Sequence, residues 1–297
     1  MTQANEFKFF PGCFIGNRIP FIEASARKVF EKLGIEISDA PFACCPDPVG
    51  QASTDHLSWL TLGAYNLSIA EAEGKDIMSV CNGCFQTLKL VNHELKHSDH
   101  QKAKINKILG EIGREFKGTI DVRHFVEVMY EISEEKIKEH VVKDLSSLKV
   151  ACHTGCHYMR PSEKVQTDDP MKPIKLRALV KAVGATSVDY DTEVLCCGAG
   201  TEHAEPEPAM AILAQKYKSA VAAGAECFIT NCPQCFQQFD SKLRDLEKHT
   251  GIKYTIPVLY ITELMALAYG FDPDDLGIKF HRARVTNLLE KHGLKQN

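Results

Sequence analysis

The segment Leu195-Cys196-Cys197-Gly198-Ala199-Gly200, and its weaker counterpart Ala43-Cys44-Cys45-Pro46-Asp47, each contain two adjacent cysteines. Neighbouring side chains on a β-strand point to opposite faces, so an adjacent pair can serve one centre only from a tight, irregular loop. The glycines and prolines that follow the cysteines supply a backbone of this kind. We therefore predict that each pair lies in a loop and that the remaining sequence positions these two loops.

Each adjacent pair belongs to a longer pattern of five cysteines. A single cysteine precedes the pair, and a Cys-x-x-Cys motif follows it after 35 residues in the first half and 34 in the second. Cys235 follows Cys84 by 151 positions and Cys197 follows Cys45 by 152, which indicates an internal duplication. The two sets are Cys13, Cys44, Cys45, Cys81 and Cys84, and Cys156, Cys196, Cys197, Cys232 and Cys235.

Short apolar runs alternate with amphipathic segments along the chain. We predict strands at 7–10, 35–37, 76–80, 148–152, 187–190 and 227–230. We predict helices at 21–33, 54–72, 174–183, 208–223 and 236–248, and one or two helices at 85–112, with Thr54 or Ser53 capping the second helix. This order predicts an α/β fold of two pseudo-symmetric β/α domains, residues 1–146 and 147–297. Because no Pro/Gly-rich linker joins them, we expect the domains to pack face to face.

Composition and charge argue against several classes of protein. The net charge of −4 gives no basic surface for nucleic acid. No apolar run approaches eighteen residues, so we expect no membrane span, and the first residues lack the features of a secretory signal. We therefore expect a cytoplasmic protein, in which twelve cysteines are not a disulfide framework.

Most of the ten repeated cysteines come just after a predicted strand, and the strand ends of a β/α sheet meet at one edge. Five thiolates exceed the four of a zinc site or of a conventional four-iron cluster, so the pattern favours an iron–sulfur assembly. A structural zinc site in one or both halves, and thioredoxin-like dithiol chemistry, are the alternatives. Cys152 and Cys227 fall outside the repeat, and we expect them to be small buried residues.

The duplicated five-cysteine pattern resembles the cysteine-rich CCG domain family. Cys196-Cys197-Gly198 has the family motif, whereas Cys44-Cys45-Pro46 departs from it at the glycine and keeps the ligands. Within the family, the chain resembles the B subunits of the heterodisulfide reductases of methanogenic archaea. The resemblance implies that each set of five holds a noncubane [4Fe-4S] cluster. It also implies that the two facing clusters reduce the disulfide of coenzyme M and coenzyme B.

The same resemblance implies partner proteins. These are a flavin-containing A subunit and an iron–sulfur C subunit of heterodisulfide reductase, with a hydrogenase completing a complex that performs electron bifurcation at the flavin. The chain has neither a dinucleotide fingerprint nor a ferredoxin-type cysteine motif, so its electrons would come from a separate iron–sulfur protein. The alternative within the family is an electron-transfer subunit of a lactate, glycolate, fumarate or succinate enzyme.

Reduction of a disulfide takes two electrons, and the product thiolates need protons. Iron–sulfur centres usually deliver electrons singly, which gives a reason for two copies. His153, His157 and His203 are candidate proton donors, although hydrogen-bonded or exposed structural histidines are the simpler interpretation. Arg18 and Arg160 follow the first cysteine of each set by five and four residues. They are candidate ligands for the anionic groups of the substrate, or else ordinary surface residues.

Overall fold

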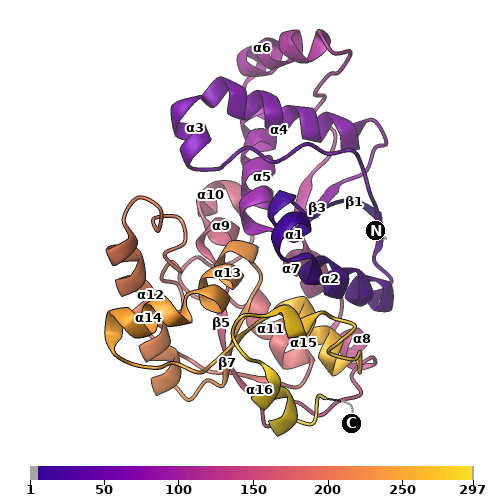
Figure 1. The fold of residues 1–297 in the computed structure, drawn as a ribbon. Helices are drawn as coiled ribbons and strands as arrows, with labels where there is room; N and C mark the ends of the chain where they lie inside the picture. The colour runs from indigo at the N-terminus through magenta and orange to yellow at the C-terminus, as the bar shows by residue number, and fades with distance from the viewer. Residues whose placement is uncertain (1–5, 296–297) are drawn as a thin grey trace.

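The computed structural model describes residues 6–295, which form two four-stranded parallel sheets with the strand orders β2-β1-β3-β4 and β6-β5-β7-β8. The first sheet contains β1 (Glu6–Phe10), β2 (Glu36–Ser38), β3 (Ile77–Ser79) and β4 (Val122–His124). The second contains β5 (Lys149–His153), β6 (Thr186–Ser187), β7 (Cys227–Thr230) and β8 (Val258–Tyr260). Figure 1 shows the two halves one above the other. The predicted α/β fold with two similar halves is confirmed.

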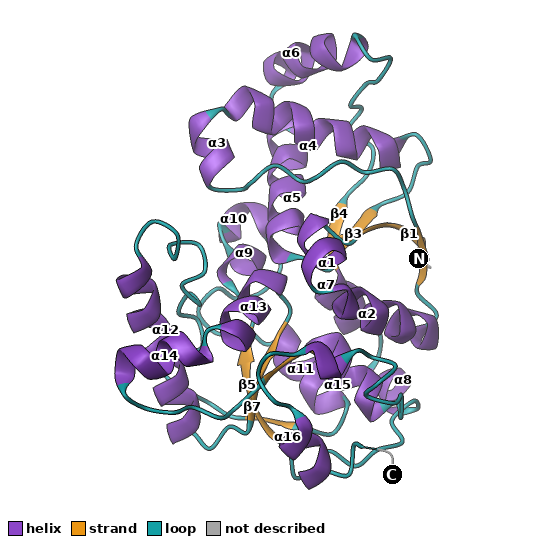
Figure 2. Cartoon of the chain, in the orientation of Figure 1, coloured by secondary structure: helices purple, strands orange, loops and turns teal. Residues whose placement is uncertain are grey.

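Helices surround both sheets (Figure 2). Those of the first half are α1 (Cys13–Arg18), α2 (Pro20–Leu33), α3 (Gly50–Thr54), α4 (His56–Glu71), α5 (Asn82–Lys96), α6 (Asp99–Gly110), α7 (Phe125–Glu131) and α8 (Glu134–Lys138). Those of the second half are α9 (Cys156–Met159), α10 (Ser162–Val165), α11 (Lys175–Ala182), α12 (Pro206–Ala222), α13 (Pro233–Ser241), α14 (Leu243–Thr250), α15 (Ile261–Ala268), the 3-10 helix η1 (Ile278–Phe280) and α16 (Thr286–Lys291). Within residues 6–295, none of these helices combines the length and the apolar character needed to cross a membrane.

Most predicted elements lie close to the observed ones, but the strand predicted at 187–190 shares only Ser187 with β6, and several helix ends differ. The cap of α4 is Asp55, whose carboxylate accepts a hydrogen bond from the Ser58 amide at 3.0 Å, and not Thr54 or Ser53, which belong to the separate helix α3. The predicted helix 236–248 is two helices that meet at Lys242. Each change follows from a local break in the helical hydrogen-bond ladder.

The two halves pack through helices that follow their strands. Helix α2 packs on α15, and α7 packs on α11. The hydroxyls of Ser25 and Thr262 lie 2.8 Å apart in the buried α2–α15 contact. The ring of Phe125, at the start of α7, stacks on Tyr260 with the centroids 5.9 Å apart. The interface is therefore a continuous buried core and not a loose hinge.

The segment after α15 returns from the second half to this interface. His281 makes an ion-pair contact with Glu263 at 2.8 Å, and its ring lies 5.0 Å from that of Phe21 in α2. The Asp240 carboxylate accepts hydrogen bonds from the backbone amides of Arg282 and Ala283 at 2.9–3.0 Å. The C-terminal segment thus fastens α2 of the first half to α13 of the second.

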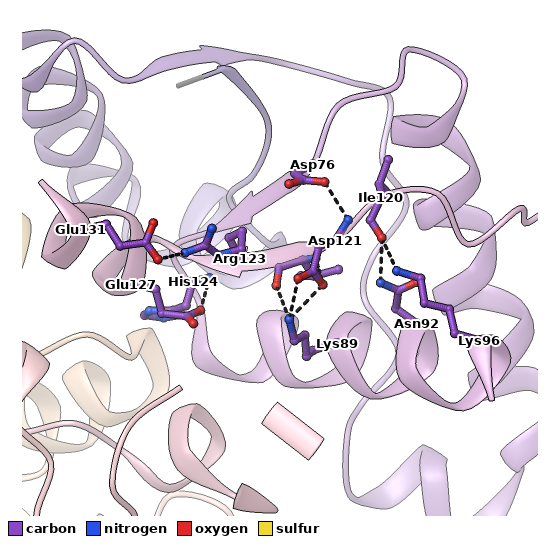
Figure 3. Close-up of polar contacts among 11 residues, drawn as sticks. Asp76, Lys89, Asn92, Lys96, Ile120, Asp121, Arg123, His124, Glu127 and Glu131 are labelled. Carbon is purple, nitrogen blue, oxygen red and sulfur yellow. Dashed lines mark hydrogen bonds and ion pairs between the residues drawn. The ribbon is translucent and has the colours of Figure 1, made fainter. Parts of the chain in front are cut away.

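Helix α5 carries the first Cys-x-x-Cys motif at its amino end, and polar contacts fix the helix against β4 (Figure 3). The Lys89 ammonium lies 2.9 and 3.0 Å from the carboxylate oxygens of Asp121. Asn92 and Lys96 both donate to the carbonyl of Ile120, at 3.1 and 2.7 Å. Because these contacts fix the rotation and height of α5, they also fix its cysteines.

Close packing of α4 on α5 depends on Gly63. A Cβ at this position would lie 2.6 Å from Cγ2 of Val91, nearer than carbon atoms normally approach. We expect Gly63→Ala to lower the free energy of unfolding by about 1–3 kcal/mol, the usual cost of overpacking a core. Gly110→Ala is the control, because a Cβ at the end of α6 meets nothing within 4 Å. Anaerobic denaturant titration of both variants measures the difference, and equal stabilities would contradict the packing argument.

Candidate metal centres

The five predicted cysteines of the first half gather at the carboxyl edge of the first sheet. The sulfur atoms of Cys13 and Cys44 are 3.2 Å apart, and those of Cys45 and Cys84 are 3.0 Å apart. Cys84 also shares a hydrogen bond with Cys81. The thiols come from α1 after β1, from the loop after β2, and from the turn that joins β3 to α5. Sulfur contacts therefore connect the members of this set.

The second half repeats this contact pattern position by position. Cys156 contacts Cys196, Cys197 contacts Cys235, and Cys235 contacts Cys232 through side-chain hydrogen bonds. These thiols come from α9 after β5, from the loop after β6, and from the turn that joins β7 to α13. The duplication seen in the sequence therefore extends to which thiols interact with each other.

The thiols of each set compete for protons. Hydrogen bonds from Cys156 and Cys197 lower the pKa of Cys196, and the contact with Cys196 raises the pKa of Cys156. The contact with Cys84 likewise lowers the pKa of Cys81, whereas contacts with the neighbouring thiols raise the pKa of Cys84. Neutral thiols thus sit beside favoured thiolates, and a metal would displace the remaining protons.

The two sets differ in their access to solvent. Cys13 and Cys44 are exposed, whereas all five thiols of the second set are buried or half-buried. The first set is therefore the one more open to a molecule arriving from outside.

The predicted burial of Cys152 and Cys227 is confirmed, because both lie fully buried in β5 and β7.

The adjacent cysteines reach the same arrangement through different backbones. Gly198 has φ +89°, and a Cβ there would lie 2.8 Å from the carbonyl oxygen of Ala209, so the second loop requires glycine. In the first loop Pro46 stands at this point, and its carbonyl accepts a hydrogen bond from the Thr87 hydroxyl at 2.8 Å. The departure from the glycine motif therefore leaves the first set of thiols together.

The two sets meet at the interface between the halves. Asn82, inside the first Cys-x-x-Cys motif, donates to the carbonyl of Thr154 at 2.8 Å, and a Cβ at Gly155 would lie only 2.6 Å from the same amide nitrogen. The buried hydroxyl of Tyr260 donates to the carbonyl of Val80. Both carbonyls lie within two residues of a predicted ligand. Contacts between the halves therefore position ligands of both sets.

The structure places the three predicted histidines differently. His153 is buried, and its Nε2 lies 3.3 Å from the sulfur of Cys235. His153, Cys197 and Cys235 offer ligand atoms that all lie within 4.8 Å of one another. His157 is half-buried at the interface, where a Cβ at Gly83 would lie 3.9 Å from its Nδ1. His203 is exposed in a turn before α12, and within the described residues it has no hydrogen bond to a cysteine.

The two predicted arginines are not equivalent either. Arg18 is exposed and lines a groove of about 990 Å³ between the halves, together with Phe236 and Gln237 just after Cys235. Arg160 is also exposed, but it donates to backbone carbonyls near its own half of the site, those of Pro170 at 3.3 Å and Val194 at 3.5 Å. Arg18 faces a space that a ligand can enter, whereas Arg160 braces the loop before Cys196.

Sequence reasoning missed two buried polar residues behind the adjacent cysteines. Asn66 in α4 accepts from the amide of Ala43 at 2.8 Å and donates to the carbonyl of Cys44 at 3.4 Å. Lys216 in α12 is fully buried and donates to backbone carbonyls of the second loop, including that of Leu195 at 2.8 Å. The sequence did contain a signal for both residues, because helical spacing places them on the apolar side of their helices.

The donors present fit a thiolate-bound iron–sulfur group. Sulfur ligands favour iron–sulfur clusters, zinc or cuprous copper, and five contacting thiols exceed what tetrahedral zinc needs. Lys216 adds a buried positive charge that a set of thiolates would balance. Each half supplies a full set of five thiols for such a group from its own residues.

Comparisons with known proteins agree with this geometry. The model of the cysteine-rich CCG domain matches residues 7–89 and 150–240. The chain is 38% identical over 291 residues to the B subunit of the ferredoxin:CoB-CoM heterodisulfide reductase of Methanosarcina mazei, covering 97% of each chain. It is 30% identical to the 8-methylmenaquinol:fumarate reductase membrane anchor subunit of Wolinella succinogenes, covering 95% of this chain and 99% of that protein. The crystal structure of a hypothetical protein from Helicobacter pylori has the same fold, with a TM-score of 0.75 at 16% identity over 95% of this chain and 53% of that chain.

Gly198 provides a test of the second centre that leaves every cysteine in place. We expect Gly198→Ala to displace the Cys196-Cys197 loop and to remove roughly half of the bound iron, because only one of two similar sites is disturbed. Gly200→Ala is the matched control, since a Cβ there meets nothing within 4 Å. Iron and acid-labile sulfide per chain after anaerobic purification measure the effect. Full iron content in Gly198→Ala would contradict it.

Proposed function

The chain belongs to the cysteine-rich CCG domain family, and we propose that it reduces the disulfide of coenzyme M and coenzyme B as the B subunit of a heterodisulfide reductase. One structural observation gives the proposal its main support. Two five-cysteine sets with the same contact pattern meet across one interface, so a small disulfide bound there can reach both. The name of the Methanosarcina mazei relative, which matches over nearly its whole length, supports the choice of substrate.

We propose that each set of cysteines is an iron–sulfur site and that it holds one noncubane [4Fe-4S] cluster. The five thiols of a set support this choice, because a conventional cubane cluster needs four. When bound, the two clusters would supply the two electrons that turn a disulfide and two protons into two thiols. In this proposal residues 1–146 and 147–297 are two CCG domains, each providing one centre.

The protein's own residues would bind the substrate and direct its approach. The exposed side of the first set, at Cys13 and Cys44, is the open route to the sulfur atoms. Arg18 lies at the end of α1, the helix that begins with Cys13, and faces the groove between the halves. Its guanidinium group suits the sulfonate, phosphate and carboxylate groups of the two coenzymes. Arg160 would act indirectly, by holding the loop that leads to Cys196.

Two protons must reach the product sulfur atoms. His157 is the better-placed donor, because it is half-buried and lies near the first Cys-x-x-Cys turn, where a Cβ at Gly83 would be 3.9 Å from its Nδ1. Burial lowers the pKa of His157, so a nearby negative charge would be needed to hold its proton at neutral pH. His153 contacts Cys235, and we propose that its role is to orient that thiolate. His203 has no part in this proposal.

The electrons must come from other proteins. The relative from Methanosarcina mazei is named for ferredoxin, an iron–sulfur electron donor. We propose that this chain works in a multisubunit complex, with a flavin-containing A subunit and an iron–sulfur C subunit as its electron route and a hydrogenase as the source. Flavin chemistry in such a complex belongs to the A subunit.

A second function has one observation in its favour. The relative from Wolinella succinogenes matches over nearly the whole chain and is named for a fumarate reductase. In that role the same cysteine sets would pass electrons to a partner without reducing a disulfide. The Methanosarcina mazei protein is the more similar of the two, at 38% against 30% identity, so disulfide reduction is the preferred proposal.

Activity with and without single thiols tests the reaction. With reduced viologen as electron donor, the anaerobic protein should reduce the coenzyme M–coenzyme B disulfide. Cys45→Ala and Cys197→Ala should each remove this activity, because each takes one thiol from one set. Cys152→Ala is the control, since its thiol is buried in β5 and has the Ser187 hydroxyl as its hydrogen-bond partner at 3.4 Å. Viologen oxidation that needs no disulfide, or activity that survives either site variant, would refute the proposal.

Arg18 offers a separate test of substrate binding. Removing one charged hydrogen-bond partner costs about 1.5–3 kcal/mol, so Arg18→Gln should raise KM for the disulfide about tenfold or more, with a smaller change in kcat. Arg244→Gln is the control, because this exposed arginine lies on α14 and does not line the groove. Equal KM values for the two variants would remove Arg18 from the substrate site.

A further inference from the structure

Lys216 is a buried cation directly behind the second cysteine loop. Its side chain is fully buried and donates to the carbonyls of Thr192, Glu193 and Leu195, the last at 2.8 Å. The ammonium also lies 5.6 Å from the centre of the Tyr190 ring. These contacts hold the ammonium group against the backbone of Leu195, the residue that precedes Cys196 and Cys197.

In the described part of the chain, residues 6–295, no carboxylate lies within ion-pair distance of the Lys216 ammonium. The nearby Glu193 carboxylate is bound to Arg177 at 2.8 Å. Burial lowers the pKa of Lys216 to about 8, and attraction to Cys197, Cys235 and Cys196, and less to Glu193, opposes that shift. Burying an ammonium is costly unless an anion compensates it, and the strongest of these attractions come from the second set of cysteines.

The first half has a neutral residue in the corresponding place. Asn66 of α4 supports the first loop by bonding to Ala43 and Cys44, as Lys216 of α12 supports the second through Leu195. Both side chains are fully buried. The two centres are therefore alike in their sulfur contacts and unlike in the charge behind them.

We infer that Lys216 makes the two iron–sulfur centres electrostatically unequal and that its charge makes the centre of the second set the easier one to reduce. Reduction adds one electron, from dithionite or from an iron–sulfur donor protein, and so adds one negative charge at that centre. A fixed positive charge in a buried environment stabilises the added negative charge. The inference rests on the proposed function only in taking both sets as iron–sulfur centres. Lys216 is a positioning residue, since it acts through the cluster ligands.

Midpoint potentials test this inference without any disulfide. In redox titrations of the anaerobic protein followed by electron paramagnetic resonance, Lys216→Gln should shift the potential of one centre to more negative values and leave the other unchanged. Lys216→Arg should restore the original value, because it keeps the charge. Glutamine can still donate to the loop carbonyls, so a purely structural role would not separate these two variants. Repeating the titration in Cys45→Ala, with only the second set intact, assigns the shifted centre.

Lys8→Met is the matched control. Lys8 is also buried, at 4% exposed, but its ammonium pairs with Glu73 at 2.7 Å on the first half. Its loss should leave both potentials unchanged. Unchanged potentials in Lys216→Gln with full iron content, or equal shifts of both centres, would overturn the inference. A one-sided shift in a protein that fails to reduce the heterodisulfide would overturn only the proposed reaction.

Discussion

Hydrogen bonds that cross from one half of the chain to the other hold the two cysteine sets at a fixed separation. The Asn82 amide bonds to Thr154, and the Tyr260 hydroxyl bonds to Val80, in surroundings that exclude water. Both acceptors are backbone carbonyls beside a cysteine loop, so the same bonds join the halves and order the ligands. An unpaired buried donor costs about 1–3 kcal/mol, which makes any other spacing of the halves unfavourable. The same hydrogen bonds therefore determine both the geometry of the site and the packing of the halves.

Local patterns in the sequence predict the parts of this arrangement that depend on local chemistry. Apolar runs with turn residues predict β1 and β7, and helical spacing predicts α2, which ends at Gly34 in the left-handed conformation. The five cysteines of each set could be selected because their spacing recurs and because parallel strands bring their carboxyl ends to one edge. The fourth strand of each sheet, β4 or β8, was not predicted, because each runs without a turn into the helix that follows and its apolar residues read as part of that helix.

The rest depends on contacts between residues that are distant in the sequence. Helical spacing places Lys216 on the apolar side of α12, but only the packing of α12 against the second cysteine loop shows which carbonyls its ammonium binds. Arg18 and Arg160 occupy similar places after the first cysteines, yet one faces a groove and the other is bound to carbonyls. The repeat in the sequence therefore predicts which cysteines of the two halves correspond to each other. It does not predict the surrounding residues that make the two sites differ.

The return of the C-terminal segment to α2 sets the order in which the molecule can be completed during synthesis. Phe21 and Ser25 emerge from the ribosome long before their partners His281 and Thr262, which follow them by 260 and 237 positions. The apolar face of α2 therefore stays uncovered until α15 and the segment around His281 have been made, so the interface between the halves closes after the first sheet is complete.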